Sequence, residues 1–443
     1  MTDLSREPEP VVHTLANGVR IVAIPTPHVD SASVSVFVRT GSRNESARLA
    51  GISHFVEHMA FKGTHARDCR QINLDAEQLG AEVNAHTDKD HTAYHMLGRA
   101  RDASAFVGML GDIVRNSSFP PAEIERERQV ILQEYIEDED DPLSTAFKLF
   151  DSACYAAHAL ARPVIGTRAG IERLTRADLL DYVGRQYSGA NVVVGVAGRI
   201  DPQAALADVE AAFASMPRGA PNRIDAPAYV GGVRTQRVAG SSQSHVVLGY
   251  PTPTLLQDYH ASVVAAAVFG EGMSSPLMHE LRERRGLVYY AACSADVNDL
   301  CGQFVIEAST TPEHLDEFFT EVMRLLRSHA DAIDDDALAR ARNQIAVRRL
   351  REQERGFRRL EDAAQDLYVH GRIRSAAELE AGIEAVDARQ VRDAFQRMLE
   401  SGAALALAGK VPAGSRERLQ ALARPASGWA PSKPGVAEEN ASA

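Results

Sequence analysis

One order of secondary-structure patterns occurs twice in this chain, and the two copies are separated by a constant number of residues. Phe37 lies in an alternating apolar pattern that is typical of a half-buried strand, and Leu248 lies in a second such pattern. A strand pattern that ends at Gly198 has its counterpart at Gly409. Both pairs are 211 residues apart. A shared offset at both ends predicts a duplicated domain, so the chain must form two related folds.

Each copy contains edge strands with several helical patterns between them. This order predicts an α+β fold with two homologous domains, each a mostly antiparallel sheet with helices packed on one face. The helical patterns cover about 101–117, 121–140, 143–156 and 176–187 in the first copy, and about 312–329, 334–354, 356–371 and 386–398 in the second.

The domain boundaries follow from the repeat and from local composition. We expect a first domain over 10–216 and a second over 236–424. The segment 217–235 is rich in proline and glycine and is predicted to be a linker. The last residues, 425–443, are rich in Pro, Ser, Gly and Glu, which predicts a disordered tail.

Composition excludes several classes of function. The net charge of −12 argues against nucleic acid as a partner, because phosphate binding needs a clustered basic surface. No apolar run has the length of a membrane span, and the first residues lack the apolar core of a secretory signal. The four cysteines lack paired ligand spacing, which favours free thiols. We therefore expect a cytoplasmic protein without a membrane partner.

A compact metal-binding pattern, H-x-x-E-H, occurs in the first copy. On a helix, His54 and His58 lie one turn apart on the same face, which allows both imidazoles to bind one zinc ion. Glu57 shares this face and is placed to take a proton from the attacking water rather than to ligate. The same residue types in this order define one class of zinc peptidases.

A catalytic zinc site needs a third protein ligand. Glu127 and Glu134 are seven residues apart, on one face of a predicted helix. We assign Glu134 as the ligand and Glu127 as a residue that orients a ligand. Spacing alone cannot choose between the two glutamates. The prediction is one Zn²⁺ per chain.

The duplication supplies an internal control for this site. The positions 211 residues after the two histidines and Glu57 are Ala265, Phe269 and Val268, and the position after Glu134 is Ile345. Polar groups that the fold itself required would be present in both copies. The ligands therefore belong to a site that only one copy carries.

Longer motifs resemble a known family. The stretches GISHFVEHMAFKGT, LGAEVNAHTDKDHTAYHM, ERERQVILQEYIEDED, HALARPVIGT and EGMSSPLMHELRERRGLVYY resemble the pitrilysin family of inverted-motif zinc metallopeptidases, which includes insulin-degrading enzyme. They are most similar to two-domain members related to the β subunit of mitochondrial processing peptidase, and they extend from about residue 12 to 420. Glu134 follows His58 by 76 residues, as in the family. Ala159 stands where the family usually has proline, remote from the chemistry.

The resemblance implies further roles for residues of this chain. His54, His58 and Glu134 match the zinc ligands, Glu57 the general base and Glu127 the auxiliary glutamate. Asn84 and Ala85 match an edge strand that pairs with the substrate backbone, although an ordinary strand pair is the simpler interpretation of their sequence. Arg282 and Tyr289 match a pair that faces the zinc, where Tyr289 stabilises the oxyanion and Arg282 holds a substrate carbonyl.

The expected function is zinc-dependent hydrolysis of oligopeptides or unfolded segments by an endopeptidase. The resemblance implies that one chain forms half of a clamshell chamber. The active unit is then a homodimer, or a heterodimer with a related chain. Two alternatives remain open. One is a processing peptidase for basic presequences, suggested by the acidic run 137–141, although such runs are usually solvated helix ends. The other is a scaffold homologue without catalysis.

Overall fold

The computed structural model describes residues 9–425, so nearly all of the predicted tail 425–443 lies outside the described residues. These residues form two compact units that interleave along the sequence. The first unit contains the residues up to Glu137 together with Arg162–Ile224 and Val347–Ala376, and the second contains the remainder. The domain boundaries expected from the repeat stay a prediction.

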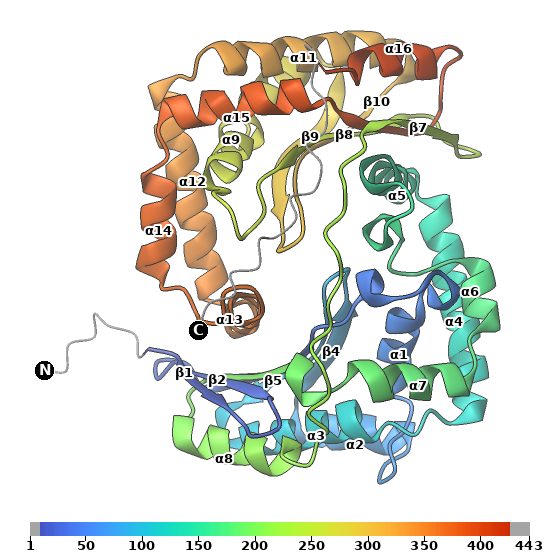
Figure 1. The fold of residues 1–443 in the computed structure, drawn as a ribbon, viewed down its shortest axis with the longest axis vertical. Coiled ribbons are helices and arrows are strands. Elements are labelled where there is room, and N and C mark those ends of the chain that lie inside the picture. Colours follow the sequence, from blue (N-terminus) through green and yellow to red (C-terminus); the bar gives the residue numbers. More distant parts are fainter. Residues whose placement is uncertain (1–8, 426–443) are drawn as a thin grey trace, which may run out of the picture. The chain divides into compact units, whose positions relative to one another are not determined.

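The first unit is built on a six-stranded sheet with the order β1-β2-β6-β3-β5-β4 (Figure 1). Only β2 and β6 pair in parallel; the other neighbouring strands are antiparallel. Strand β4 lies at an edge of this sheet. The strands are β1 (Val11–Thr14), β2 (Arg20–Pro25), β3 (Ser31–Val38), β4 (Glu82–Thr87), β5 (Thr92–Arg99) and β6 (Val192–Gly198).

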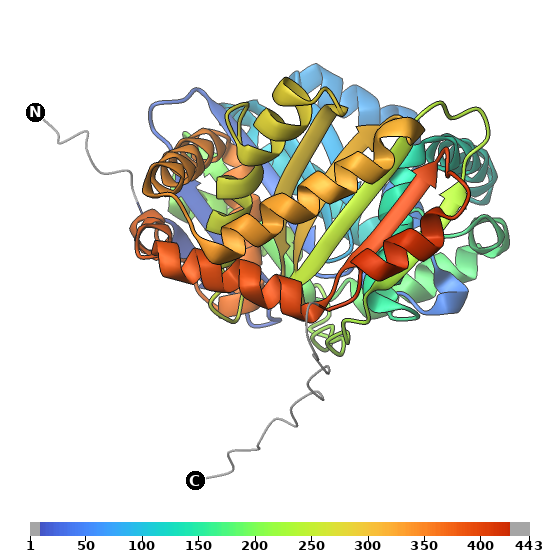
Figure 2. The ribbon, with the colours of Figure 1, turned by 90° about the horizontal axis from the view of Figure 1, so that it is seen from above.

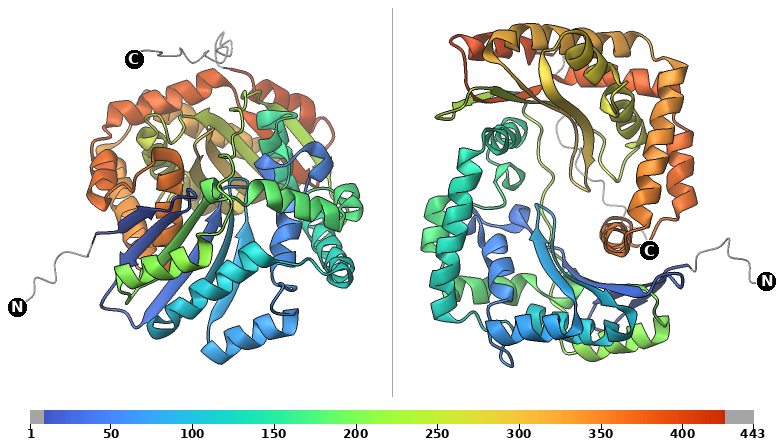
Figure 3. Two further views of the ribbon diagram at one scale, coloured as in Figure 1. Left: turned by 60° about the horizontal axis from the view of Figure 1, so that its bottom comes forward. Right: turned by 180° about the vertical axis from the view of Figure 1, so that it is seen from behind.

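Helices cover one face of this sheet (Figure 3). They bury the apolar side chains of that face. Val34 and Tyr94 from the strands pack with Phe55, Leu110 and Phe213 from the helices, and all five are fully buried. The helices of this part of the chain are α1 (Ile52–Ala60), α2 (Cys69–Leu79), α3 (Ala103–Asn116), α4 (Pro121–Asp140), α6 (Arg168–Arg173), α7 (Arg176–Gln186) and α8 (Pro202–Phe213).

The second unit repeats this topology in a five-stranded sheet with the order β7-β11-β8-β10-β9. Its one parallel pair, β7 with β11, corresponds to β2 with β6. Helices α11 and α15 cover this sheet in Figure 2. The strands are β7 (Gly232–Arg237), β8 (Ser244–Thr252), β9 (Val288–Val297), β10 (Gly302–Thr310) and β11 (Ala404–Gly409). The second repeat contributes all or most of each of these helices to the unit: α9 (His260–Gly270), α10 (Pro276–Met278), α11 (Leu315–Asp331), α12 (Asp335–Gln353), α14 (Ala376–Glu384), α15 (Ala388–Ser401) and α16 (Ser415–Leu422).

The α+β class and the duplicated architecture are therefore confirmed, and the eight predicted helical segments match α3, α4, α5, α7, α11, α12, α13 and α15 closely. Among the described residues, no helix has both the length and the apolar character needed to cross a bilayer.

Each repeat contributes one helix to the unit of the other repeat, an exchange that the sequence patterns do not predict. Helix α5 (Pro142–Tyr155) belongs to the first repeat but packs in the second unit, where Phe150 contacts the buried side chains of β8, β10 and β11. Helix α13 (Gly356–His370) belongs to the second repeat but packs in the first unit. There its Leu360 joins a buried cluster with Val22 and Phe37. Each sheet thus carries a helix on its other face as well.

Candidate metal centre

Helix α1 carries the H-x-x-E-H pattern, and its start is fixed by backbone geometry. Gly51 precedes the helix with φ of 95°, a left-handed conformation that favours glycine, and an added Cβ would lie 2.7 Å from the carbonyl oxygen of Ile165. The buried carboxylate of Glu45 accepts hydrogen bonds from the backbone N–H groups of Gly51 and Ser53, both at 2.8 Å. These contacts satisfy donors that a helix start leaves unpaired.

The apolar side of α1 is buried in the core through Ile52, Phe55, Val56 and Met59. This packing leaves His54 and His58 on the remaining face, with 17% of each side chain exposed. The two rings lie with their centroids 4.6 Å apart, so both imidazoles are available to one ligand.

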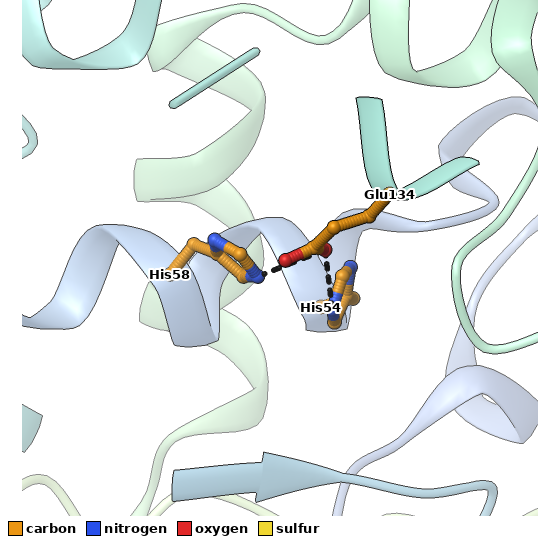
Figure 4. Close-up of side chains that lie close together, drawn as sticks. All are labelled: His54, His58 and Glu134. Atoms are coloured by element: carbon orange, nitrogen blue, oxygen red, sulfur yellow. Dashed lines mark ion pairs between the residues drawn. The ribbon is translucent and has the colours of Figure 1, made fainter. Parts of the chain in front are cut away.

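Glu134 of helix α4 meets both histidines (Figure 4). Its Oε2 atom lies 3.6 Å from Nε2 of His54 and 3.4 Å from Nε2 of His58. Two imidazole nitrogens and one carboxylate oxygen converging in this way match the donor set of a catalytic zinc site, which leaves a fourth position open. Burial, followed by the neighbouring His58, lowers the pKa of His54 to about 4, so His54 is neutral near pH 7, the form that binds metal. The residues present therefore fit zinc.

Glu127 has a different position from Glu134. Its Oε2 atom lies 3.2 Å from Nδ1 of His58, on the side of the ring away from Nε2, and its Oε1 atom pairs with Nζ of Lys62 at 2.7 Å. Only 7% of Glu127 is exposed. A carboxylate at Nδ1 fixes the tautomer and orientation of a ligating histidine. The structure thus separates the two glutamates that spacing alone cannot tell apart.

Glu57 lies on the same helix and contacts Thr87, a residue that the sequence patterns do not predict for the site. The hydroxyl of Thr87, at the end of strand β4, donates to Oε2 of Glu57 at 2.7 Å. Burial raises the pKa of Glu57, an effect that the hydrogen bond from Thr87 opposes. The sequence does contain one indication that Thr87 belongs to the site. Side chains alternate along a strand, so Thr87 lies on the same face of β4 as Ala85.

Comparison with known proteins supports the family. The model of Insulinase (Peptidase family M16) matches residues 20–168, and that of the Peptidase M16 inactive domain matches residues 173–345. An uncharacterized zinc protease of Mycobacterium tuberculosis is 32% identical over 424 residues, which cover 92% of this chain and 94% of the relative. The chain belongs to peptidase family M16. Since its relatives are named zinc proteases, it is a metallopeptidase in the general sense of that family.

Solved structures share the two-domain M16 fold. A protease from Helicobacter pylori, 20% identical, superposes with a TM-score of 0.84 over 91% of this chain and 100% of that chain. A chain of complex III2 from Candida albicans, 18% identical, gives a TM-score of 0.79 over 90% of this chain and 95% of that chain. At these identities the likeness concerns the fold alone.

In the second repeat of this M16 chain, the positions equivalent to the metal-centre residues belong to the hydrophobic core. Ala265, Val268 and Phe269 lie on α9 and Ile345 lies on α12, and all four are buried apolar residues, as the offset of the repeat predicts. This agrees with the inactive type of the second matching family domain.

Asn84 and Ala85 lie on β4 and pair with His95 and Tyr94 of β5. Within the described part of the chain, no strand pairs with the other edge of β4. Asn84 is exposed, and its Oδ1 accepts from the N–H of Ala85 at 2.8 Å. An open edge is what strand addition requires. The substrate-binding role of these two residues stays a prediction.

Arg282 and Tyr289 belong to the second unit. Arg282 lies in the π-helical segment η6 (His279–Arg284), and Tyr289 lies near the start of β9. The guanidinium carbon of Arg282 is 5.3 Å from the centroid of the Tyr289 ring, a cation–π contact. Tyr289 is 81% exposed, which is unusual for a large aromatic residue. The pair is thus held together at a surface, and its expected role in catalysis stays a prediction.

Proposed function

We propose that this protein is a zinc-dependent endopeptidase that hydrolyses oligopeptides or unfolded segments. The observation that carries the proposal is the position of Glu134, whose Oε2 atom faces Nε2 of both His54 and His58 while Glu57 lies on the same helix. Bound at these three residues, Zn²⁺ would act as a Lewis acid that polarises the scissile carbonyl and lowers the pKa of water.

The residues of the chain supply the proton transfers. Glu57 is the general base that takes a proton from the attacking water and passes it to the leaving amine. A raised pKa brings this carboxylate closer to the operating pH, where a base that must also act as an acid is most effective. Thr87 engages Oε2 of Glu57, which leaves Oε1 for water. Glu127 keeps His58 in one tautomer through Nδ1.

Substrate binding is proposed at the open edge of β4. An extended peptide paired with the backbone at Asn84 and Ala85 would be recognised mainly by main-chain hydrogen bonds. This mode tolerates many side chains, which suits a peptidase of broad specificity. In the second unit, Tyr289 would donate to the oxyanion that forms when the carbonyl is attacked, and Arg282 would bind a substrate carbonyl.

The proposed active assembly is a dimer. A two-domain chain supplies half of the chamber that the family resemblance implies, and a homodimer would be self-sufficient because this chain carries both the metal centre and the Arg282–Tyr289 pair. A heterodimer with a related chain is the alternative. Size-exclusion chromatography with light scattering tests this, and a stable, active monomer would contradict both assemblies.

Two other functions are less well supported. The same fold occurs in a chain of complex III2 from Candida albicans, but a scaffold has no need for the complete set His54, His58, Glu134 and Glu57. A preference for basic presequences would draw on the acidic run 137–141. Part of that run is already engaged, because Lys148 pairs with Asp138 at 2.7 Å and with Glu139 at 2.5 Å.

The test is zinc content together with cleavage of a quenched fluorescent peptide, for wild type and Glu57→Gln side by side. The expected result is about one zinc bound by His54, His58 and Glu134 in both proteins, with cleavage only in wild type. Substantial cleavage by E57Q would refute the assigned base. The scaffold function would be favoured if wild type cleaves no peptide. This result must hold when a related chain is added and when basic presequence peptides are used as substrates.

A further inference from the structure

A second group of histidines and carboxylates lies in the first unit, apart from the metal centre. His86 is on β4, Asp88 and His91 are in the turn that joins β4 to β5, and Glu361 is on the exchanged helix α13. The ring of His86 contacts Phe357 of α13 with centroids 5.8 Å apart. This group therefore lies on the α13 face of the sheet, whereas the H-x-x-E-H helix packs on the opposite face.

The distances in this group repeat those of the metal centre. Oε1 of Glu361 lies 3.3 Å from Nε2 of His86 and 3.7 Å from Nε2 of His91. In the first site the corresponding carboxylate distances are 3.6 and 3.4 Å. Asp88 lies 3.2 Å from Nδ1 of His91, the same distance as between Glu127 and Nδ1 of His58. Both sites thus combine two imidazoles, a carboxylate that they share and a second carboxylate behind one ring.

Burial and hydrogen bonding leave donor atoms available in the second group. Nε2 of His91 is buried and pairs with Glu361 at 3.7 Å, which is too long for a hydrogen bond, and it has no other hydrogen-bond partner among residues 9–425. Oε2 of Glu361 accepts from Arg358, so Oε1 is the oxygen that faces the histidines. One donor atom each of His86, Asp88 and His91 lie within 4.8 Å of one another. His86 is 34% exposed, which gives an ion a path from solvent.

We propose that the group formed by His86, Asp88, His91 and Glu361 binds a second divalent cation of the zinc class. Imidazole nitrogens with a carboxylate oxygen suit zinc and its neighbours rather than calcium or magnesium, which prefer all-oxygen sites. A simple ion-pair cluster is the competing explanation, because protonated histidines would pair with Glu361 without any metal.

An ion at this position would act on the strand that borders the metal centre. It would join Glu361 of α13 to the ligands of the β4–β5 hairpin. The same hairpin carries Thr87, which contacts Glu57, and the proposed substrate residues Asn84 and Ala85. The second ion would therefore hold the edge strand in place without taking part in the chemistry.

The test is the number of zinc ions bound by the full-length chain. Metal-free protein is titrated with Zn²⁺ in a calorimeter, and metal content is measured after desalting. Wild type is expected to bind two ions per chain. His86→Ala and Glu361→Gln are each expected to bind one, and His58→Ala is expected to keep the second ion while losing the first.

The matched control is His260→Ala in the second unit, where the imidazole pairs with Asp258 at 3.5 Å and the described residues add no third ligand to the group. This variant should bind as many ions as wild type. Circular dichroism checks folding, and H86A and E361Q serve as independent tests if one is unstable. The proposal is overturned if wild type binds a single ion that H58A abolishes, or if H86A and E361Q both still bind two. These counts do not depend on peptide cleavage, so they separate this proposal from the proposed function.

Discussion

The hydroxyl of Thr87 donates a 2.7 Å hydrogen bond to Glu57, which connects the edge strand β4 directly to the helix that carries the two histidines. The proposed general base and the proposed substrate strand are thus mechanically linked through one side chain. A change in strand position would move the carboxylate that must receive the proton.

Replacing Thr87 by valine should lower turnover while zinc stays bound. Valine keeps the shape but removes the donor to Glu57, and a hydrogen bond to a charged group contributes roughly 1.5–3 kcal/mol. A fall in kcat of about tenfold or more is expected, with KM changed less. Thr87→Ser retains the hydroxyl and should retain most of the activity. Equal kcat for T87V and wild type would remove Thr87 from the mechanism.

Glu127→Gln should lower the affinity for zinc more than it lowers the activity of protein that already holds zinc. Glu127 contacts Nδ1 of His58 and not the shared Nε2 position. Loss of such a supporting carboxylate typically lowers metal affinity by about 10–100-fold. Competition with a chromophoric chelator measures this change. Glu134→Gln is the comparison, and it should lose zinc more severely; the reverse order would exchange the two assignments.

Glu45 should make the stability of the metal-free protein depend on pH. Burial raises its pKa to about 7 despite hydrogen bonds from Ser53 and Gly51, compared with an ordinary value of 4.5. Because the folded-state pKa is raised, the favourable contribution is fully present below pH 4.5 and is lost as the pH rises through 7. Glu45→Gln should therefore flatten the pH dependence of unfolding.

The measurement is urea unfolding at pH 5 and pH 8, with chelator present. The loss of stability between these values should be smaller in E45Q than in wild type by roughly 1–3 kcal/mol. Parallel pH profiles for the two proteins would show that Glu45 is not the titrating group.

Leu360→Ala tests the packing of the exchanged helix α13. Leu360 is 1% exposed and packs against the first sheet, so its truncation should cost about 2–5 kcal/mol in the free energy of unfolding. Leu350→Ala is the matched control, since Leu350 is 65% exposed and its loss should change stability by no more than about 0.5 kcal/mol. Similar effects of the two substitutions would argue against the packing of α13 on this sheet.

Local sequence patterns predicted most of the architecture and part of the site. The correspondence of Phe37 with Leu248 predicted two related sheets. The alternation of apolar residues in each strand and the constant spacing of the two repeats can both be read directly from the sequence. Helix spacing brought His54 and His58 together for the same reason. Glu127 and Glu134 share a helix face, so only the three-dimensional position of α1 distinguishes Nδ1 from Nε2 of His58.

Contacts between distant segments were beyond these patterns. Thr87 meets Glu57 only because β4 lies beside α1 in the fold. Glu361 reaches His86 because α13 packs on the first sheet, and helix periodicity does not state which sheet a helix will cover. Only the family resemblance predicts a role for Arg282 and Tyr289.

The exchange of α5 and α13 has a consequence for biosynthesis. The ribosome finishes every strand of the first sheet by Gly198, yet the apolar side chains of Val22 and Phe37 have no cover until Gly356–His370 emerge. In the nascent chain, the apolar face of the first sheet that α13 covers therefore stays exposed while about 160 further residues are synthesised. At roughly 5–20 residues per second this interval is about 8–30 s, long enough for a chaperone to bind that surface.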